Sequence, residues 1–269
     1  MLKKILRALS NRAFQHLYIF RLHPLRNFFY SFIKIFLEKS KSRRIKVNLK
    51  TDLWDFGFCV LDNLSSSSIS ALVEELNNDK LLYFDPWDEK GSLYTLENLP
   101  KNTHTAYLSK ENSTPLFDMI SKIGEDPRIL EIVESYIGVK PSIDNIDLWY
   151  SFPTREKPKE AENFHRDTDS PKFLKLFIYL TDVDQYSGPH SYIKGTHKSN
   201  KFIANKRFIE EEIYETFGDE NDIKFTGKAG SNFIVDTYGI HRGLQPKTQK
   251  RILAQIRYSC HGSIFRYQG

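Results

Sequence analysis

Three side chains in the second half of the sequence are of types that bind metal ions. His165 and Asp167 lie two residues apart in the segment 163–169, and His241 follows much later. Residues two apart on a strand point to the same side, so His165 and Asp167 would present an imidazole and a carboxylate together. Two imidazoles and one carboxylate suit octahedral iron(II) and leave three coordination positions open. A bidentate 2-oxo acid can fill two of these positions, and O₂ can fill the third.

Arg251 makes this pattern more specific, because a histidine and an aspartate two residues apart are common in any sequence. It lies ten residues beyond His241 and opens the apolar stretch Ile252–Ile256. A guanidinium on a neighbouring strand can hold a distant carboxylate through two parallel hydrogen bonds, which a lysine does less well. The four residues together indicate an iron site with a clamp for a dicarboxylic acid.

The elements that must position these residues change in type along the chain. Apolar spacing and capping residues predict helices after the serine run at 65–68, at 115–123, at 127–138 and at 206–217. Strands are expected at 55–61, 143–152, 173–181, 191–193, 232–236 and 251–259, with a turn-rich loop over 84–113. Helices followed by strands indicate a mainly β fold with flanking helices, ending in a sandwich or barrel.

Composition limits the class of protein. The chain has 269 residues and is 40% apolar, enough to bury one large core, and we expect it to be soluble and globular. Cys59 and Cys260 lie far apart and have no metal or redox spacing. We therefore expect two buried thiols in a reducing, cytoplasmic compartment.

Residues 1–50 form a basic arm that precedes the domain. They hold 13 Lys and Arg residues against one acid, Glu38, whereas the remainder holds 26 basic and 33 acidic residues. The uncharged runs are too short for a membrane helix and lack the pattern of a signal peptide. Pro24 divides the arm into two expected amphipathic helices. These would pack on the domain or lie peripherally on an anionic membrane; nucleic-acid binding is not expected.

From about residue 51 to about 259 the chain resembles the phytanoyl-CoA dioxygenase family of 2-oxoglutarate oxygenases. The likeness rests on Asp-Phe-Gly-Phe-Cys-Val-Leu-Asp at 55–62, on His165-Arg-Asp167, and on His241-Arg-Gly followed by Arg251. The segment 187–198 is similar to the family's turn G-x-L-x-x-x-P-G-S-H-K, with Lys194 where proline is usual. The resemblance implies a double-stranded β-helix, a jelly-roll or cupin-like barrel, in a dioxygenase domain at 51–269.

The resemblance also implies roles for single residues. His165, Asp167 and His241 would hold the iron, and Arg251 would hold the C5 carboxylate of 2-oxoglutarate. Phe177 aligns with an aromatic residue that lines the co-substrate pocket.

One departure concerns the co-substrate. Gly243 occupies a position where some members have a serine that bonds 2-oxoglutarate. Tyr179 or Thr181, on the same expected strand as Phe177, would compensate for the missing hydroxyl.

The implied activity uses Fe(II), 2-oxoglutarate and O₂ to hydroxylate a C–H bond of a small organic substrate, with release of succinate and CO₂. The carboxylate of Asp167 favours hydroxylation over halogenation. Two alternatives are a catalytically silent barrel that serves as a binding or scaffold protein, and a zinc-dependent hydrolase. Arg251 argues against the hydrolase, which needs no 2-oxoglutarate clamp. Substrate specificity is expected in the loops at 84–113 and 153–163.

Overall fold

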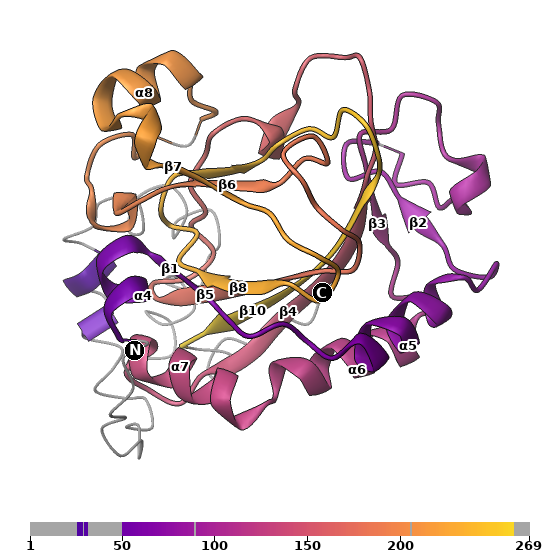
Figure 1. The fold of residues 1–269 in the computed structure, drawn as a ribbon, viewed down its shortest axis with the longest axis horizontal. Coiled ribbons are helices and arrows are strands. Elements are labelled where there is room, and N and C mark those ends of the chain that lie inside the picture. The colour runs from indigo at the N-terminus through magenta and orange to yellow at the C-terminus, as the bar shows by residue number, and fades with distance from the viewer. Residues whose placement is uncertain (1–25, 29, 32–49, 89, 205, 261–269) are drawn as a thin grey trace, which may run out of the picture.

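Two antiparallel sheets face each other in the computed structural model, which describes residues 26–28, 30–31, 50–88, 90–204 and 206–260 (Figure 1). The larger sheet has the order β1 (Phe58–Val60), β8 (Asn232–Val235), β5 (Phe173–Tyr179), β10 (Arg251–Ser259), β4 (Ser142–Ser151), β3 (Thr105–Leu108) and β2 (Tyr83–Phe84). The smaller sheet has the order β7 (Asp222–Phe225), β6 (His190–Ile193) and β9 (His241–Gly243). This is the jelly-roll arrangement expected from the sequence.

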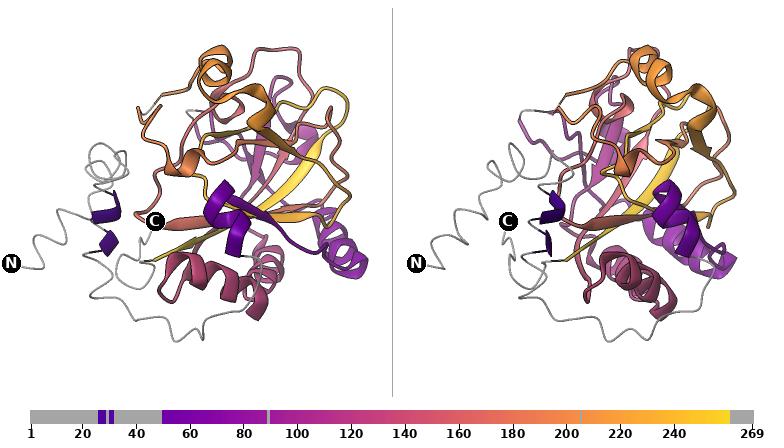
Figure 2. Two further views of the ribbon diagram at one scale, coloured as in Figure 1. Left: turned by 60° about the vertical axis from the view of Figure 1, so that its left-hand side comes forward. Right: turned by 90° about the vertical axis from the view of Figure 1, so that its left-hand side faces the viewer.

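Helices cover the outer face of the larger sheet (Figures 1 and 2). They are α5 (Ser66–Leu76), α6 (Thr114–Gly124) and α7 (Pro127–Ile137), while α4 (Lys50–Phe56) precedes β1 and α8 (Glu210–Phe217) precedes β7. Local sequence sets their ends. The Ser65 hydroxyl accepts a hydrogen bond from the Ser68 amide at the start of α5. Asp126 caps α7, which ends at Gly138 in the left-handed conformation.

Alternation along the strands of the larger sheet divides their side chains between two environments. Leu174, Leu176 and Ile178 of β5 pack in the cluster shared with the helices. Phe177 packs in a second cluster, between the sheets, with aromatic residues such as Tyr192 of β6. On the neighbouring strands, Arg251, Leu253 and Gln255 of β10 and Trp149 and Ser151 of β4 line the cavity between the sheets. This alternation ends at the irregular pairing between Arg257 and Tyr258, beyond which Ile143 packs on the helix side.

Most of the expected elements are confirmed. The strands expected at 143–152, 173–181, 191–193, 232–236 and 251–259 end within two residues of the observed bounds. The strand expected at 55–61 is wrong in its first part, because α4 continues to Phe56. Gly57, with φ of 91°, then turns the chain into β1. The loop expected at 84–113 contains β3, and the helix expected at 206–217 begins at Glu210.

Part of the basic arm packs on the domain. Arg26 is buried, its Nε donates to the Pro171 carbonyl at 2.6 Å, and its guanidinium lies 4.0 Å from the centre of the Tyr238 ring. The two helices expected on either side of Pro24 lie largely outside the described residues, and the division at residue 50 stays a prediction. In the part of the chain that the structure describes, no helix has the length and apolar character needed to cross a membrane.

Both cysteines are buried free thiols, as expected. Burial raises the pKa of Cys59 to about 12 and that of Cys260 to about 11. Neither thiol is therefore a reactive nucleophile at neutral pH.

Candidate metal centre and co-substrate pocket

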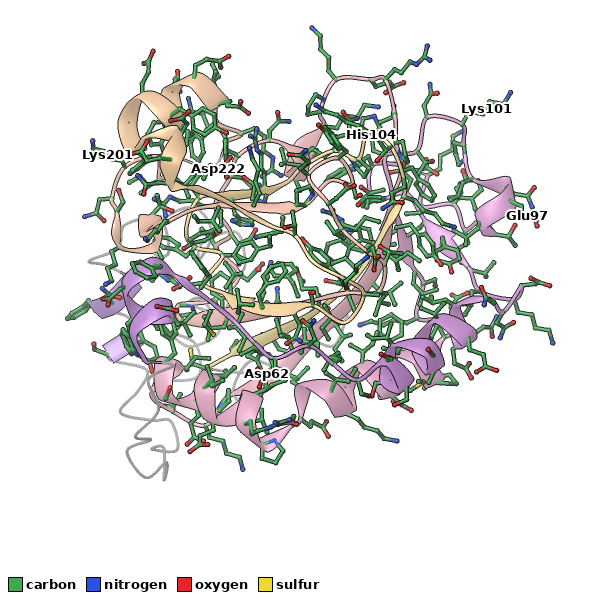
Figure 3. All side chains as sticks on the ribbon, in the orientation of Figure 1. Asp62, Glu97, Lys101, His104, Lys201 and Asp222 are labelled. Carbon is green, nitrogen blue, oxygen red and sulfur yellow. The ribbon has the colours of Figure 1, made fainter. Side chains whose placement is uncertain are left out.

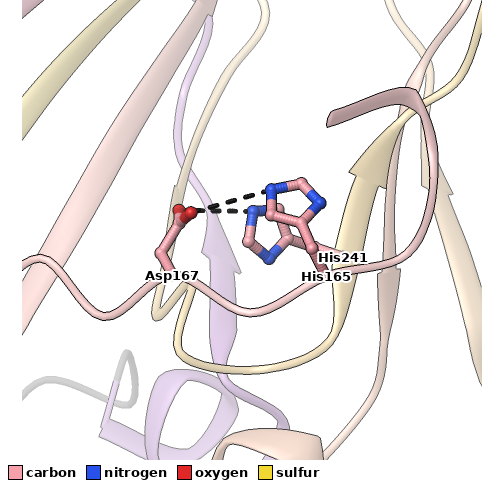
Figure 4. Close-up of side chains that lie close together, drawn as sticks. All are labelled: His165, Asp167 and His241. Carbon is pink, nitrogen blue, oxygen red and sulfur yellow. Dashed lines mark ion pairs between the residues drawn. The ribbon is translucent and has the colours of Figure 1, made fainter. Parts of the chain in front are cut away.

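The structure brings His165, Asp167 and His241 together between the two sheets. His165 Nε2 lies 3.6 Å from Asp167 Oδ1, and His241 Nε2 lies 3.3 Å from Asp167 Oδ2. One potential ligand atom from each residue falls within 4.8 Å of the others. Figure 4 shows both imidazole rings directed toward the carboxylate. Three donors at this spacing can bind a single ion.

Backbone pairing aligns the two segments that carry these residues. The amide of His165 donates to the His241 carbonyl at 2.9 Å, and the amide of His241 donates back at 3.0 Å. Two residues along, the Asp167 amide donates to the Thr237 carbonyl at 2.9 Å. The three side chains are therefore set by a short antiparallel ladder, which leaves little freedom to separate them.

Each histidine has one ring nitrogen committed to the backbone. His165 Nδ1 donates to the Asn163 carbonyl, and His241 Nδ1 donates to the Gly239 carbonyl, both at 2.9 Å. Because a carbonyl only accepts, the proton of the neutral ring is on Nδ1 and the lone pair is on Nε2. Both lone pairs are thus available to a metal at the atoms that face Asp167.

The surroundings of His165 and Asp167 favour the protonation states that bind a metal ion. Burial, with a smaller contribution from His241, lowers the pKa of His165 to about 3, so the ring is neutral at pH 7. Burial alone would raise the pKa of Asp167, but the Lys175 ammonium, with a smaller contribution from the hydrogen bond to His241, outweighs it and holds that pKa well below its usual value. The triad at pH 7 therefore includes a neutral His165 and an ionised Asp167.

A buried ionic network extends from Asp167 toward the far end of β10. The Lys175 ammonium donates to Asp167 Oδ2 at 2.7 Å and lies 3.0 Å from Asp169 Oδ2. Asp169 is in turn 3.1 Å from Arg257, which also pairs with Asp144 at 2.6 Å. Burial lowers the pKa of Lys175, but the two carboxylates outweigh it and raise that pKa above its usual value. Lys175 thereby holds one oxygen of Asp167 in place.

A cavity of about 160 Å³ opens beside the triad and reaches Arg251. The Arg251 guanidinium is buried; it donates to the Gly188 carbonyl through Nη1 and to the Ser151 hydroxyl through Nη2 at 3.0 Å. Its Nε has no hydrogen-bond partner among the described residues. The clamp predicted from the sequence therefore shares one cavity with the three candidate metal ligands.

Comparison with protein-family models matches residues 56–252 to the phytanoyl-CoA dioxygenase family. This match spans more than half of the chain and includes all four predicted residues. The chain belongs to the phytanoyl-CoA dioxygenase family. No curated protein sequence matches it.

Solved structures share the fold of this family member at low sequence identity. EctD from S. alaskensis with bound Fe is 17% identical, with a TM-score of 0.58 over 82% of this chain and 79% of EctD. AviO1 from Streptomyces viridochromogenes Tue57 is 15% identical, with a TM-score of 0.52 over 81% of this chain and 96% of AviO1. The epimerase SnoN from nogalamycin biosynthesis is 15% identical, with a TM-score of 0.54 over 78% and 79% of the two chains.

Iron and 2-oxoglutarate, the cofactors expected from the family, are bound in structures of EctD. The donor set of our protein fits such an ion. Two imidazole nitrogens and one carboxylate on one side of a cavity are the ligands that non-haem iron(II) oxygenases use, with the other side left open.

The other residues predicted to contact the co-substrate are Phe177, Tyr179 and Thr181, and they lie in different surroundings. Phe177 lines the cavity. The side chains of Tyr179 and Thr181 do not line it. The Tyr179 hydroxyl donates to the Phe225 carbonyl and accepts from the His190 amide, both at 2.9 Å. The Thr181 hydroxyl accepts from the Ile252 amide at 3.1 Å.

Several lining residues have no role in the sequence analysis, among them the polar residues Ser151, Lys175, His190 and Glu162. Ser151 and Lys175 could have been found from strand alternation, since each shares the inner face of its strand with a predicted or aromatic site residue. His190 stands at the leucine position of the family's turn and lies directly opposite Gly243 in the β6–β9 pairing. Glu162 carries no sequence signal of this kind.

Proposed function

We propose that this protein is an Fe(II)- and 2-oxoglutarate-dependent dioxygenase that hydroxylates a C–H bond of a small organic molecule. One oxygen atom of O₂ would enter the hydroxyl group and the other the succinate, while 2-oxoglutarate loses CO₂. The observation that carries the proposal is the shared cavity of His165, Asp167, His241 and Arg251. A metal triad alone suits several chemistries, whereas a triad with a buried guanidinium suits a metal that works with a dicarboxylate.

Bound at the triad, iron would supply the activation of O₂, and the protein would supply geometry and exclusion of water. His165, His241 and Asp167 would hold the ion. Arg251 would pair with the C5 carboxylate, because its buried guanidinium lines the same cavity as the triad and its Nε has no hydrogen-bond partner among the described residues. Burial lowers the pKa of Arg251 but a guanidinium remains charged at pH 7, so the clamp keeps its charge.

His190 would add a contact to the co-substrate. Its ring lies 5.4 Å from that of His241 and 4.5 Å from that of Phe177, and its Nε2 is buried without a hydrogen-bond partner among the described residues. Burial, then the charges of His241 and Arg251, lower the pKa of His190 well below its usual value. A neutral imidazole can donate one hydrogen bond to a carboxylate. His190 would thus supply the bond for which Gly243 has no side chain.

An assay of 2-oxoglutarate consumption tests the proposal. Protein purified without oxygen and then supplied with Fe(II), ascorbate, a metabolite extract and O₂ is expected to form succinate from 2-oxoglutarate, and His165→Ala and Asp167→Ala are expected to abolish it. A silent barrel forms no succinate with any metabolite extract. A zinc-dependent hydrolase releases its product without consuming O₂ or 2-oxoglutarate.

The mass of the product then separates hydroxylation from other oxidations. Hydroxylation adds one oxygen atom to the substrate, and that atom comes from ¹⁸O₂ when the reaction runs under labelled gas. Epimerisation, the activity named for SnoN, leaves the mass unchanged. A product with unchanged mass would contradict the hydroxylation part of the proposal.

A further inference from the structure

Glu162 lines the cavity with one carboxylate oxygen fixed and the other free. Its Oε2 accepts from the Lys159 amide at 2.7 Å and lies 2.8 Å from His104 Nδ1. Its side chain is 10% exposed, and its Oε1 is buried with no hydrogen-bond partner among the described residues. His104, which contacts Glu162, is buried and lies in the upper part of the view in Figure 3. The carboxylate is therefore held by two contacts that do not use Oε1.

A buried oxygen of a carboxylate is costly unless something donates to it. The Lys159 ammonium does not bond Oε1, because it pairs with Glu156 at 2.5 Å. Lys175 is likewise held by Asp167 and Asp169. The donor for Oε1 is then expected from a molecule that enters the cavity.

Glu162 is hydrogen-bonded through Oε2 to the amide of Lys159, a residue that the cavity shares with a second hollow. A hollow of about 520 Å³ lies against Pro86, Trp87, Asp88, Lys159 and Glu160. Trp87 and Lys159 line both this hollow and the inner cavity. The inner cavity, at about 160 Å³, has little room beyond a dicarboxylate that reaches Arg251. A substrate would therefore extend past Glu162 into the outer hollow and over Trp87, whose side chain is 44% exposed.

We propose that Glu162 is a specificity residue that accepts a hydrogen bond from an O–H or N–H group of the substrate. The substrate class is then a polar ring compound, an amine or a polyhydroxy compound, rather than a simple acyl chain. The flat face of Trp87 would contact the apolar face of such a ring. This inference rests on the proposed function, since it places the substrate beside the co-substrate.

Glu162→Gln provides a sharp test because the site fixes how the new amide lies. The Lys159 amide is a donor, so the glutamine oxygen takes the position of Oε2 and the NH₂ group takes that of Oε1. The variant thus presents a donor where the wild type presents an acceptor, with almost no change in shape. Glu211→Gln is the matched control, since Glu211 is an exposed acid on α8 that lines neither the cavity nor the outer hollow.

Three ring probes of similar size measure the preference directly: cyclohexylamine, cyclohexanol and cyclohexanone, which differ in their ability to donate. Binding to Zn(II)-loaded protein, with and without 2-oxoglutarate, is followed by saturation-transfer NMR. Wild type and Glu211→Gln are expected to bind the amine or the alcohol about tenfold more tightly than the ketone. Glu162→Gln is expected to reverse that order. If Glu162→Gln weakens binding of the amine more than binding of the alcohol, the substrate is cationic. If it weakens both equally, the substrate is a neutral polyol.

Equal binding of the three probes to the wild type would overturn the inference, even if Glu162→Gln failed to fold. An unchanged order in a folded Glu162→Gln would overturn it as well. Failure of the proposed function is separately visible, because the wild type would then show no 2-oxoglutarate binding in the Zn(II)-loaded state, whatever the order of the probes.

Discussion

Lys175 and Asp167 form a buried ion pair beside the candidate metal site, with the ammonium 2.7 Å from Asp167 Oδ2. The pair occupies one carboxylate oxygen and leaves Oδ1, 3.6 Å from His165 Nε2, to complete the triad. Lys175 also separates two like charges, those of Asp167 and Asp169. The site is thus stabilised before a metal binds.

We expect Lys175→Met to destabilise the metal-free protein by about 3 kcal/mol, because it leaves the buried Asp167 carboxylate without its lysine partner. Addition of Ni(II) should restore part of this loss, since the ion would then supply the missing charge. Urea unfolding at pH 7, with and without the metal, measures both effects. Lys172→Met is the matched control: Lys172 contacts the Tyr136 ring, and burial lowers its pKa to about 8. Equal stability of the two variants would show that the pair has no structural role.

Arg251→Lys tests the clamp. A lysine keeps the charge but loses the paired donors, and loss of such a charged contact costs about 2–3 kcal/mol. The KM for 2-oxoglutarate is therefore expected to rise by about 30- to 150-fold, with metal affinity unchanged. Arg257→Lys, on the same strand but paired with Asp144 and Asp169, is expected to leave that KM unchanged. A similar rise in both variants would contradict a specific role for Arg251.

Much of the fold could be predicted from periodicity. The long apolar strands β4, β5 and β10 lie where the sequence places them. The three-residue strand β9, which carries His241, was not expected, and His165 and Asp167 lie outside the named strands. The error at 55–61 has a physical cause, because Asp55 and Phe56 end helix α4 and only the positive φ of Gly57 starts the strand. Short strands such as β3 depend on pairing with a long neighbour, which local sequence does not reveal.

The site could be predicted only in part. His165, Asp167, His241 and Arg251 have side chains whose chemistry is specific, and the structure brings them to one cavity. The partners that tune them depend on packing. The register of β10 against β4 sets Arg251 opposite Ser151. This pairing decides that the Ser151 hydroxyl is the one that bonds Arg251.

His190→Leu is expected to weaken 2-oxoglutarate binding about tenfold, because the proposed hydrogen bond is lost while an apolar side chain fills the space. Adding Gly243→Ser should restore most of the affinity. A Cβ at residue 243 would lie 3.3 Å from Arg251 Nη2, so the serine requires the guanidinium to shift by a few tenths of an ångström. Calorimetry on Ni(II)-loaded protein measures the three affinities. Unchanged binding by His190→Leu would remove His190 from the co-substrate site.

The lowered pKa of His165 predicts a pH dependence of stability. Its folded value is about 3, below the ordinary value of 6.5, so below pH 6.5 the unfolded chain binds a proton that the folded protein does not. Stability contributed by the neutral ring is present above pH 6.5 and is lost as the pH falls toward 3. Metal-free wild type should therefore lose about 2 kcal/mol relative to His165→Gln between pH 7 and pH 5. Parallel urea-unfolding curves for both proteins at the two pH values would contradict the assignment of a neutral buried ring.

Anomalous diffraction at the iron edge, from crystals grown without oxygen in Fe(II) and 2-oxoglutarate, tests the central claim most directly. We predict one iron peak within bonding distance of His165 Nε2, His241 Nε2 and an oxygen of Asp167, with the far carboxylate of the co-substrate on Arg251. Asp167→Ala crystals should lack the peak. Iron bound elsewhere, or 2-oxoglutarate with its carboxylate turned away from Arg251, would contradict the oxygenase account.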